Sequence, residues 1–151
     1  MRNFFAAKLY QEIKKNKKII LLSADIGNRL FDKIKKDFPK NFLNCGIAEP
    51  NMVTFAAGLS KDGFLPVCYT ITNFLIYKSL EQIRNDAIYN NNKILLVGTG
   101  SGLSYSHLGP THHSLEDIGF LNNLPKIKIF SPADNNDLKV HLEYFFKKKK
   151  K

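Results

Sequence analysis

Residues 44–51, with the sequence NCGIAEPN, are the ones best placed for chemistry. The residues before them, 41–43, are typical of a short strand, and the apolar run that follows is typical of a helix. Proline suits the first turn of a helix, so Pro50 predicts Glu49 as the N-cap. A carboxylate ahead of an almost uncharged helix is costly to bury without a partner. Glu49 therefore either caps the helix or pairs with a ligand, and these residues alone leave both interpretations open.

Residues 100–113 are rich in glycine and histidine. No cysteine or carboxylate cluster accompanies these histidines at metal-ligand spacing, so we expect no metal site on this chain. Gly98, Gly100 and Gly102 follow an apolar run, but a dinucleotide fingerprint needs G-x-G-x-x-G at the start of a helix. A flexible loop explains these glycines better. The P-loop and the G-x-S-x-G motif of serine hydrolases are absent from the sequence.

Predicted strands and helices alternate along the chain. Apolar runs predict strands at residues 19–22, 42–43, 65–70, 93–99 and 126–130. Helical periodicity predicts helices over residues 3–16, about 30–38, 50–61, 74–89 and 114–123, and from residue 131 onward. This alternation predicts a three-layer α/β/α domain with a mostly parallel sheet covered on both faces. The loops after parallel strands meet at one edge, where ligands bind. We expect Asp25, Glu49, the residues after Thr70, the 100–113 loop and Asp134 to share that rim.

The composition bounds the class of protein. A chain of 151 residues with 44% hydrophobic and 24% charged residues is long enough for one domain with its own core, which we assign to residues 1–146. The net charge of +10 includes the five lysines 147–151, which predict a solvated, disordered tail. No basic face interleaved with aromatic residues accompanies them, so we predict no nucleic-acid partner.

The cysteines and the apolar runs indicate the compartment. Cys45 and Cys68 lack CxxC spacing and a secretory context, so we expect both to be reduced and buried. No signal peptide or membrane-length apolar run is present, and the expected location is the cytoplasm without a membrane partner.

Five short motifs follow one another along the chain: Gly46-Ile47-Ala48-Glu49, Phe55-Ala56-Ala57-Gly58-Leu59, Phe74-Leu75, Gly109-Pro110-Thr111-His112 and Ser131-Pro132-Ala133-Asp134. Their order and spacing resemble the pyrimidine-binding domain of the transketolase family, from about residue 24 to residue 134. The resemblance is especially close to transketolases encoded as two halves, of which this chain resembles the second. Deoxyxylulose-phosphate synthases share the first and fourth motifs, and the β subunits of 2-oxo-acid dehydrogenases share the first.

The resemblance implies thiamine diphosphate as cofactor and two-carbon ketol transfer between sugar phosphates as the reaction. Glu49 matches the family glutamate that hydrogen-bonds the pyrimidine ring nitrogen and favours the imino tautomer, whose exocyclic nitrogen takes the thiazolium proton. Phe74 matches the phenylalanine that stacks on the pyrimidine. Tyr77 falls where a second aromatic contact is common. An aromatic stripe on a helix also suits a protein core.

Two more residues match family positions. Asp25 matches an aspartate near the thiazolium ring, although aspartate here also suits a turn. His112 matches the histidine that faces the reactive oxygens of the sugar, where imidazole can donate, accept or carry a proton. Leu108 departs from the acidic residue that usually helps to read the sugar hydroxyls, which leaves the sugar undefined.

The Gly-Asp-Gly…Asn motif, through which the family binds the diphosphate and Mg²⁺, is absent from this sequence. The resemblance therefore implies that a separate N-terminal diphosphate-binding subunit holds them, in a homo- or hetero-oligomer, and that this chain is inactive alone. Two alternatives stay open. The chain is a deoxyxylulose-phosphate synthase-like domain, or it is a truncated module that pairs without catalysis.

Overall fold

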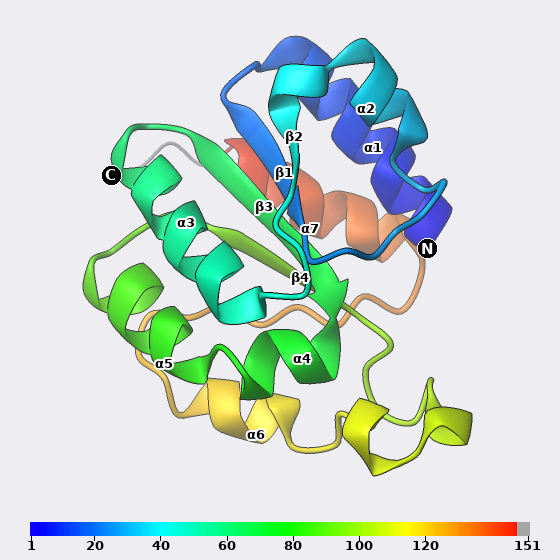
Figure 1. Ribbon diagram of the computed structural model, residues 1–151, viewed down its shortest axis with the longest axis vertical. Helices are drawn as coiled ribbons and strands as arrows, with labels where there is room; N and C mark the ends of the chain where they lie inside the picture. Colours follow the sequence, from blue (N-terminus) through cyan, green and yellow to red (C-terminus); the bar gives the residue numbers. More distant parts are fainter. Residues whose placement is uncertain (148–151) are drawn as a thin grey trace.

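Four parallel strands form the centre of the protein, in the spatial order β2-β1-β3-β4 (Figure 1). The computed structural model describes residues 1–147. The strands are β1 (Ile19–Ser23), β2 (Phe42–Asn44), β3 (Leu65–Ile71) and β4 (Leu95–Thr99). In the register of the sheet, Leu21 lies opposite Phe42 on one side and Val67 on the other. The carboxyl ends of all four strands therefore point to one edge.

Helices cover both faces of this sheet, because successive strand residues point to opposite faces. Leu21 belongs to one buried cluster and Leu22 to the other. The first cluster is closed by α1 (Arg2–Lys15), α2 (Asp32–Asp37) and α7 (Asn135–Lys147). The second is closed by α3 (Glu49–Lys61), α4 (Thr72–Tyr77), the helical segment of α5 (Leu80–Gln82) and η2 (Ile83–Tyr89), and α6 (Asp117–Asn122). Figure 1 shows these two groups on opposite sides of the strands. The predicted α/β/α arrangement is confirmed.

The predicted helix over residues 74–89 is wrong as a single element. It is divided into α4, α5 and the π-helical η2, with a break at Lys78 and Ser79. Ser79 has φ −114° and ψ 14°, outside helical geometry. The pieces on both sides of the break keep their apolar residues, such as Leu75 and Ile83, in the same buried cluster. Tertiary packing thus overrides the continuous helical pattern of the sequence.

The predicted strand at residues 126–130 is also wrong, since residues 1–147 contain only the four strands above. Lys126 has a φ of +65°, which turns the backbone away from an extended path. Ile127 packs on the cluster beneath α3 and α4, whereas the Phe130 ring stacks on His141 of α7 with centroids 4.4 Å apart. The segment crosses from one helical layer to the other and does not pair with the sheet.

The end of the described chain is helical. Lys147 is the last residue of α7 and pairs with Glu143 at 3.0 Å, and the remainder of the predicted 147–151 tail lies outside the described residues.

Cys68 is buried as expected, but Cys45 is only half-buried, and burial raises the pKa of both thiols. No helix within residues 1–147 is long and apolar enough to cross a membrane.

The backbone of β4 packs closely against the start of α4 at Gly98. A Cβ atom on Gly98 would lie 2.5 Å from the Thr72 hydroxyl and 3.0 Å from the Thr72 Cα. We expect Gly98→Ala to lower the free energy of unfolding by about 1–3 kcal/mol, measured by urea denaturation, because the strand must move. Gly58→Ala is the matched control, since Gly58 is exposed within α3 and has no atom within 4 Å of the added Cβ. It should stabilise the chain by about 0.5–1 kcal/mol, and equal losses in both variants would contradict the close approach.

Candidate active site at the carboxyl edge of the sheet

Glu49 lies buried at the start of α3. Ala48 is the N-cap and Glu49 the first helical residue, one position later in the helix than predicted. The turn that leads there includes Gly46 at φ +71°, a value that favours glycine, and the Gly46 N–H donates to Asn44 Oδ1 at 3.0 Å. Glu49 is 1% exposed, and its carboxylate accepts a hydrogen bond from the Lys78 ammonium. The carboxylate is therefore committed to a cation from another helix and is not an N-cap.

Phe74 lies one helical turn before Lys78, and the Lys78 ammonium that bonds Glu49 also contacts the Phe74 ring. Lys78 Nζ lies 5.5 Å from the centroid of the Phe74 ring, within the range of a cation–π contact. Lys78 is the C-cap of α4, and its side chain is 43% exposed. A buried carboxylate, an ammonium and an aromatic face therefore meet at the edge where the sheet's strands end.

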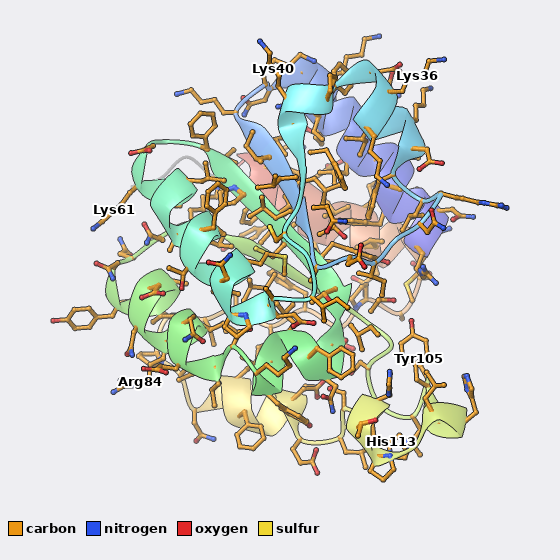
Figure 2. All side chains as sticks on the ribbon, viewed as in Figure 1. Lys36, Lys40, Lys61, Arg84, Tyr105 and His113 are labelled. Atoms are coloured by element: carbon orange, nitrogen blue, oxygen red, sulfur yellow. The ribbon has the colours of Figure 1, made fainter. Side chains whose placement is uncertain are left out.

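The 100–113 loop brings His112 to the same place. The His112 ring stands edge-on to Phe74, with centroids 5.0 Å apart, and lies 6.3 Å from the Tyr105 ring. Asn73, the neighbour of Phe74 on α4, donates a hydrogen bond to the His113 carbonyl. Figure 2 shows Tyr105 and His113 on this loop, next to α4. The structure thus brings Glu49, Phe74 and His112 together through α3, α4 and the loop.

Asp117 anchors the two ends of this loop. Its Oδ2 accepts hydrogen bonds from the hydroxyls of Ser101 at 2.7 Å and Ser114 at 2.9 Å. The backbones of Gly102 and Ser114 also pair, with N–O distances of 2.9 Å and 3.0 Å. Ser114 and Asp117 are both buried. The loop that carries His112 is therefore closed at its base by a buried carboxylate.

Asp25 and Tyr77 have different neighbours from Glu49. Asp25 has a φ of +51°, and its backbone N–H and carboxylate both bond the Asn44 side-chain amide, at 3.1 Å and 2.8 Å. This pair joins the turn after β1 to the last residue of β2, so Asp25 does shape a turn at the predicted rim. The Tyr77 hydroxyl bonds the Glu116 carboxylate, and its ring stands 5.4 Å from Phe120. The hydrogen bond from Tyr77 lowers the pKa of Glu116, and burial raises the pKa of Tyr77.

Asp134 does not contribute a free carboxylate to the rim. Its Oδ1 accepts hydrogen bonds from the backbone N–H groups of Asn136 and Asp137, at 2.8 Å and 2.9 Å. It therefore caps the N-terminus of α7.

Three charged residues of this edge, Lys78, Arg2 and Arg29, were not predicted from the sequence. Lys78 was detectable, because a residue four positions after Phe74 shares its helical face. Two arginines were missed as well. A polar hollow of about 550 Å³ is lined by Met1, Arg2, Asn3, Asn28, Arg29 and Leu30. Arg2 Nε donates to the Tyr69 hydroxyl at 3.2 Å, and this bond raises the pKa of Arg2. Because Arg2 and Arg29 come from separate elements, only the folded chain shows them together.

Metal ligands do not gather at this edge. Within residues 1–147, no group of three or more His, Cys, Asp and Glu side chains is arranged to hold a metal ion. The charged groups that meet at Phe74 are the Glu49 carboxylate and the Lys78 ammonium, and the guanidinium groups of Arg2 and Arg29 line the separate polar hollow.

The family follows from comparison with known proteins. The profile of the transketolase pyrimidine-binding domain matches residues 1–151, and the chain belongs to this family. A subunit of an apulose-4-phosphate transketolase from Actinobacillus succinogenes is 40% identical over 109 residues, which are 72% of this chain and 35% of that protein. A protein of the same name from Phocaeicola vulgatus is 34% identical over 134 residues, 88% of this chain and 43% of that protein. The chain thus spans less than half the length of both relatives.

Two solved structures and a second group of relatives agree with this assignment. A structure described as a split gene transketolase, inactive beta4 tetramer, superposes with a TM-score of 0.83 at 30% identity, over 97% of this chain and 47% of that chain. The transketolase from Leishmania mexicana has a TM-score of 0.85 at 19% identity, over 96% of this chain and 23% of that one, and so shares the fold. A 1-deoxy-D-xylulose-5-phosphate synthase from Geobacter sulfurreducens is 33% identical over 92% of this chain and 22% of its own length.

The role of Asp117 is testable by substitution. In Asp117→Ala the hydroxyls of Ser101 and Ser114 lose their shared acceptor, which should cost about 1–3 kcal/mol of folding free energy. We expect faster hydrogen–deuterium exchange at the amides of Gly102 and Ser114, measured by mass spectrometry. Ser104→Ala removes an exposed hydroxyl of the same loop and should leave that exchange unchanged. Unaltered protection in Asp117→Ala would show that other contacts hold the loop.

Proposed function

We propose that this chain is the pyrimidine-binding half of a thiamine diphosphate-dependent transketolase, which transfers two-carbon ketol units between sugar phosphates. The observation that carries the proposal is the buried Glu49 carboxylate, which shares a cation with the face of Phe74 at the carboxyl edge of the sheet. Two similar proteins that are named as transketolase subunits support ketol transfer as the reaction.

The residues present fit the pyrimidine ring of the cofactor. Lys78 Nζ is bonded to Glu49 and lies 5.5 Å from the Phe74 centroid, so the carboxylate oxygen lies within about 9 Å of that centroid. Aromatic rings pack with their centroids about 4.5–7 Å apart, so a pyrimidine on Phe74 would lie about as far from its centroid as Lys78 Nζ, the atom that bonds Glu49. A carboxylate for the ring nitrogen and an aromatic face for the ring are thus both available.

Each predicted residue has a proposed role in this reaction. Thiamine diphosphate, when bound, supplies the carbanion chemistry of ketol transfer. Glu49 would hold the proton shared with the pyrimidine ring nitrogen, and Phe74 would support the ring. His112, beside Phe74, would exchange protons with the sugar oxygens. Asp25 would lie toward the thiazolium side, and Tyr77 would contact the cofactor through its ring.

Positive charge in the polar hollow supports sugar phosphates as substrates. Arg2 and Arg29 line the polar hollow, and guanidinium groups bind phosphate through paired N–H donors. Leu108, which stands where transketolases usually have an acid, is exposed on the loop before His112. In this proposal the sugar hydroxyls are recognised without a carboxylate at that position.

Exposed apolar side chains on α3 and in the turn before it support a partner subunit. Ile47, two residues before Glu49, is 76% exposed, and Phe55 is exposed on α3. Exposed apolar surface beside a site suits an interface. We propose that a separate diphosphate-binding subunit covers this surface in a homo- or hetero-oligomer and holds the diphosphate and Mg²⁺. We place the assembly in the cytoplasm, in carbohydrate metabolism.

A second candidate function is 1-deoxy-D-xylulose-5-phosphate synthesis, which the Geobacter sulfurreducens relative favours. The two reactions differ in their donor substrate. Consumption of pyruvate in the presence of glyceraldehyde phosphate by the assembled protein would support the synthase, and ketol transfer between sugar phosphates without pyruvate would support the transketolase.

Calorimetry and a Glu49 variant test the proposal together. Thiamine diphosphate should bind to this chain only in the presence of a diphosphate-binding subunit, and Glu49→Gln should then lower the ketol-transfer rate by roughly 10²- to 10⁴-fold, because an amide cannot exchange the ring-nitrogen proton. Glu81→Gln, an exposed residue of α5, is the matched control and should keep full activity. Full activity of Glu49→Gln in the assembly would refute the catalytic role. Failure of the mixture to bind the cofactor would favour a pairing module without catalysis.

A further inference from the structure

We propose that Lys78 is an internal competitor for the pyrimidine ring. Its ammonium lies on both groups that would hold the ring, the Glu49 carboxylate and the Phe74 face, and it must leave them before a pyrimidine binds. This inference rests on the proposed function and adds a residue that sets the affinity and selectivity of the same site.

The burial of Glu49 requires a charged partner. A carboxylate that is 1% exposed has lost nearly all contact with water, which is costly unless a cation and hydrogen bonds replace it. The Lys78 ammonium supplies both, as a charged donor bonded to Glu49 Oε2. The pair therefore offsets much of the cost of burying the carboxylate inside the fold.

The same lysine nitrogen also contacts Phe74. Lys78 Nζ lies 5.5 Å from the ring centroid, so its positive charge interacts with the aromatic face. An N–H donor to Glu49 and a contact with the Phe74 face are the two interactions that a pyrimidine with a protonated ring nitrogen would make. A stacked ring and the lysine nitrogen cannot occupy this space together, so one must exclude the other.

The Lys78 side chain has a route by which it can leave Glu49 and Phe74. Lys78 lies at the break between α4 and α5, and its side chain is 43% exposed. Rotation about its side-chain bonds would carry the ammonium into water, where it is well solvated, without any movement of the helices. Glu49 would then be unpaired unless the ligand brings its own N–H donor. The exchange therefore favours an aminopyrimidine over flat rings that cannot donate to the carboxylate.

Affinity measurements test the competition. Thiamine diphosphate binding is measured by calorimetry on the complex of this chain with the diphosphate-binding subunit, for wild type, Lys78→Met and Lys78→Arg. Methionine keeps a linear side chain but removes the competing charge, so we expect binding to tighten roughly two- to fivefold, the range of a partly exposed ion pair. Arginine keeps the charge and the donors and should not tighten binding. Unchanged or weaker binding by Lys78→Met would overturn the inference.

Lys61→Met is the matched control. Lys61 ends α3 and is exposed, and Figure 2 shows it on the outside of the molecule. This variant removes one lysine charge far from Phe74, and its affinity should equal that of wild type. Tightening by both lysine variants would indicate a general effect of net charge and would overturn the specific role of Lys78.

Nuclear magnetic resonance follows Lys78 directly. The lysines are ¹³C-methylated reductively, and the Lys78 signal is identified by its loss in Lys78→Arg. In the chain alone, this signal should shift in Glu49→Gln, because the ion pair is broken. In the complex, it should move toward the position of exposed lysines when thiamine diphosphate is added.

The outcomes separate the inference from the function on which it rests. If wild type binds the cofactor, the Lys78 signal stays in place and Lys78→Met binds equally well, the proposed function survives and the competitor role is refuted. If neither wild type nor Lys78→Met binds the cofactor in the complex, both are refuted. If Lys78→Met alone binds it, the competitor role is supported in its strongest form.

Discussion

A buried carboxylate must have a partner, and the surroundings of Glu49 follow from that requirement. Its burial is costly in free energy unless a cation or a hydrogen-bond donor faces it. The fold meets this requirement through Lys78, which reaches Glu49 from a different helix. The break after α4 and the turn at Gly46 place the two side chains within hydrogen-bonding distance. The pair offsets the cost of burying the carboxylate, and in our proposal a ligand that enters the site replaces the lysine.

The parallel sheet explains why distant residues reach this place. Glu49 follows β2, Phe74 follows β3 and His112 follows β4, and the carboxyl ends of these strands lie at one edge. The register of the sheet brings the three segments to a common edge. The buried Asp117 then closes the base of the loop that carries His112. The sheet brings the segments to the site, and local polar contacts fix their side chains.

The fold was predictable in outline because its signals are local. Predicted strands of four to seven residues correctly marked β1, β3 and β4, and helical periodicity correctly marked α1 and α3. The two errors arose where packing outweighed the local pattern. The stripe over residues 74–89 looked continuous but is broken at Ser79, and the run at 126–130 became a crossing segment whose Phe130 packs on α7. The Phe130 contact joins that segment to a helix outside the local pattern.

The sequence by itself determined the family, the α/β/α architecture and the edge at which Glu49, Phe74 and His112 lie, because short motifs and strand–helix alternation are properties of neighbouring residues. Only the tertiary structure decided which side chains are paired. Tyr77 bonds Glu116, Asp25 bonds Asn44, and Lys78 bonds Glu49 across 29 positions of sequence. Such pairs depend on how whole elements pack, and a hydrogen bond is lost when its atoms move apart by about 1 Å. Sequence spacing does not resolve distances of that size, whereas the packed fold does.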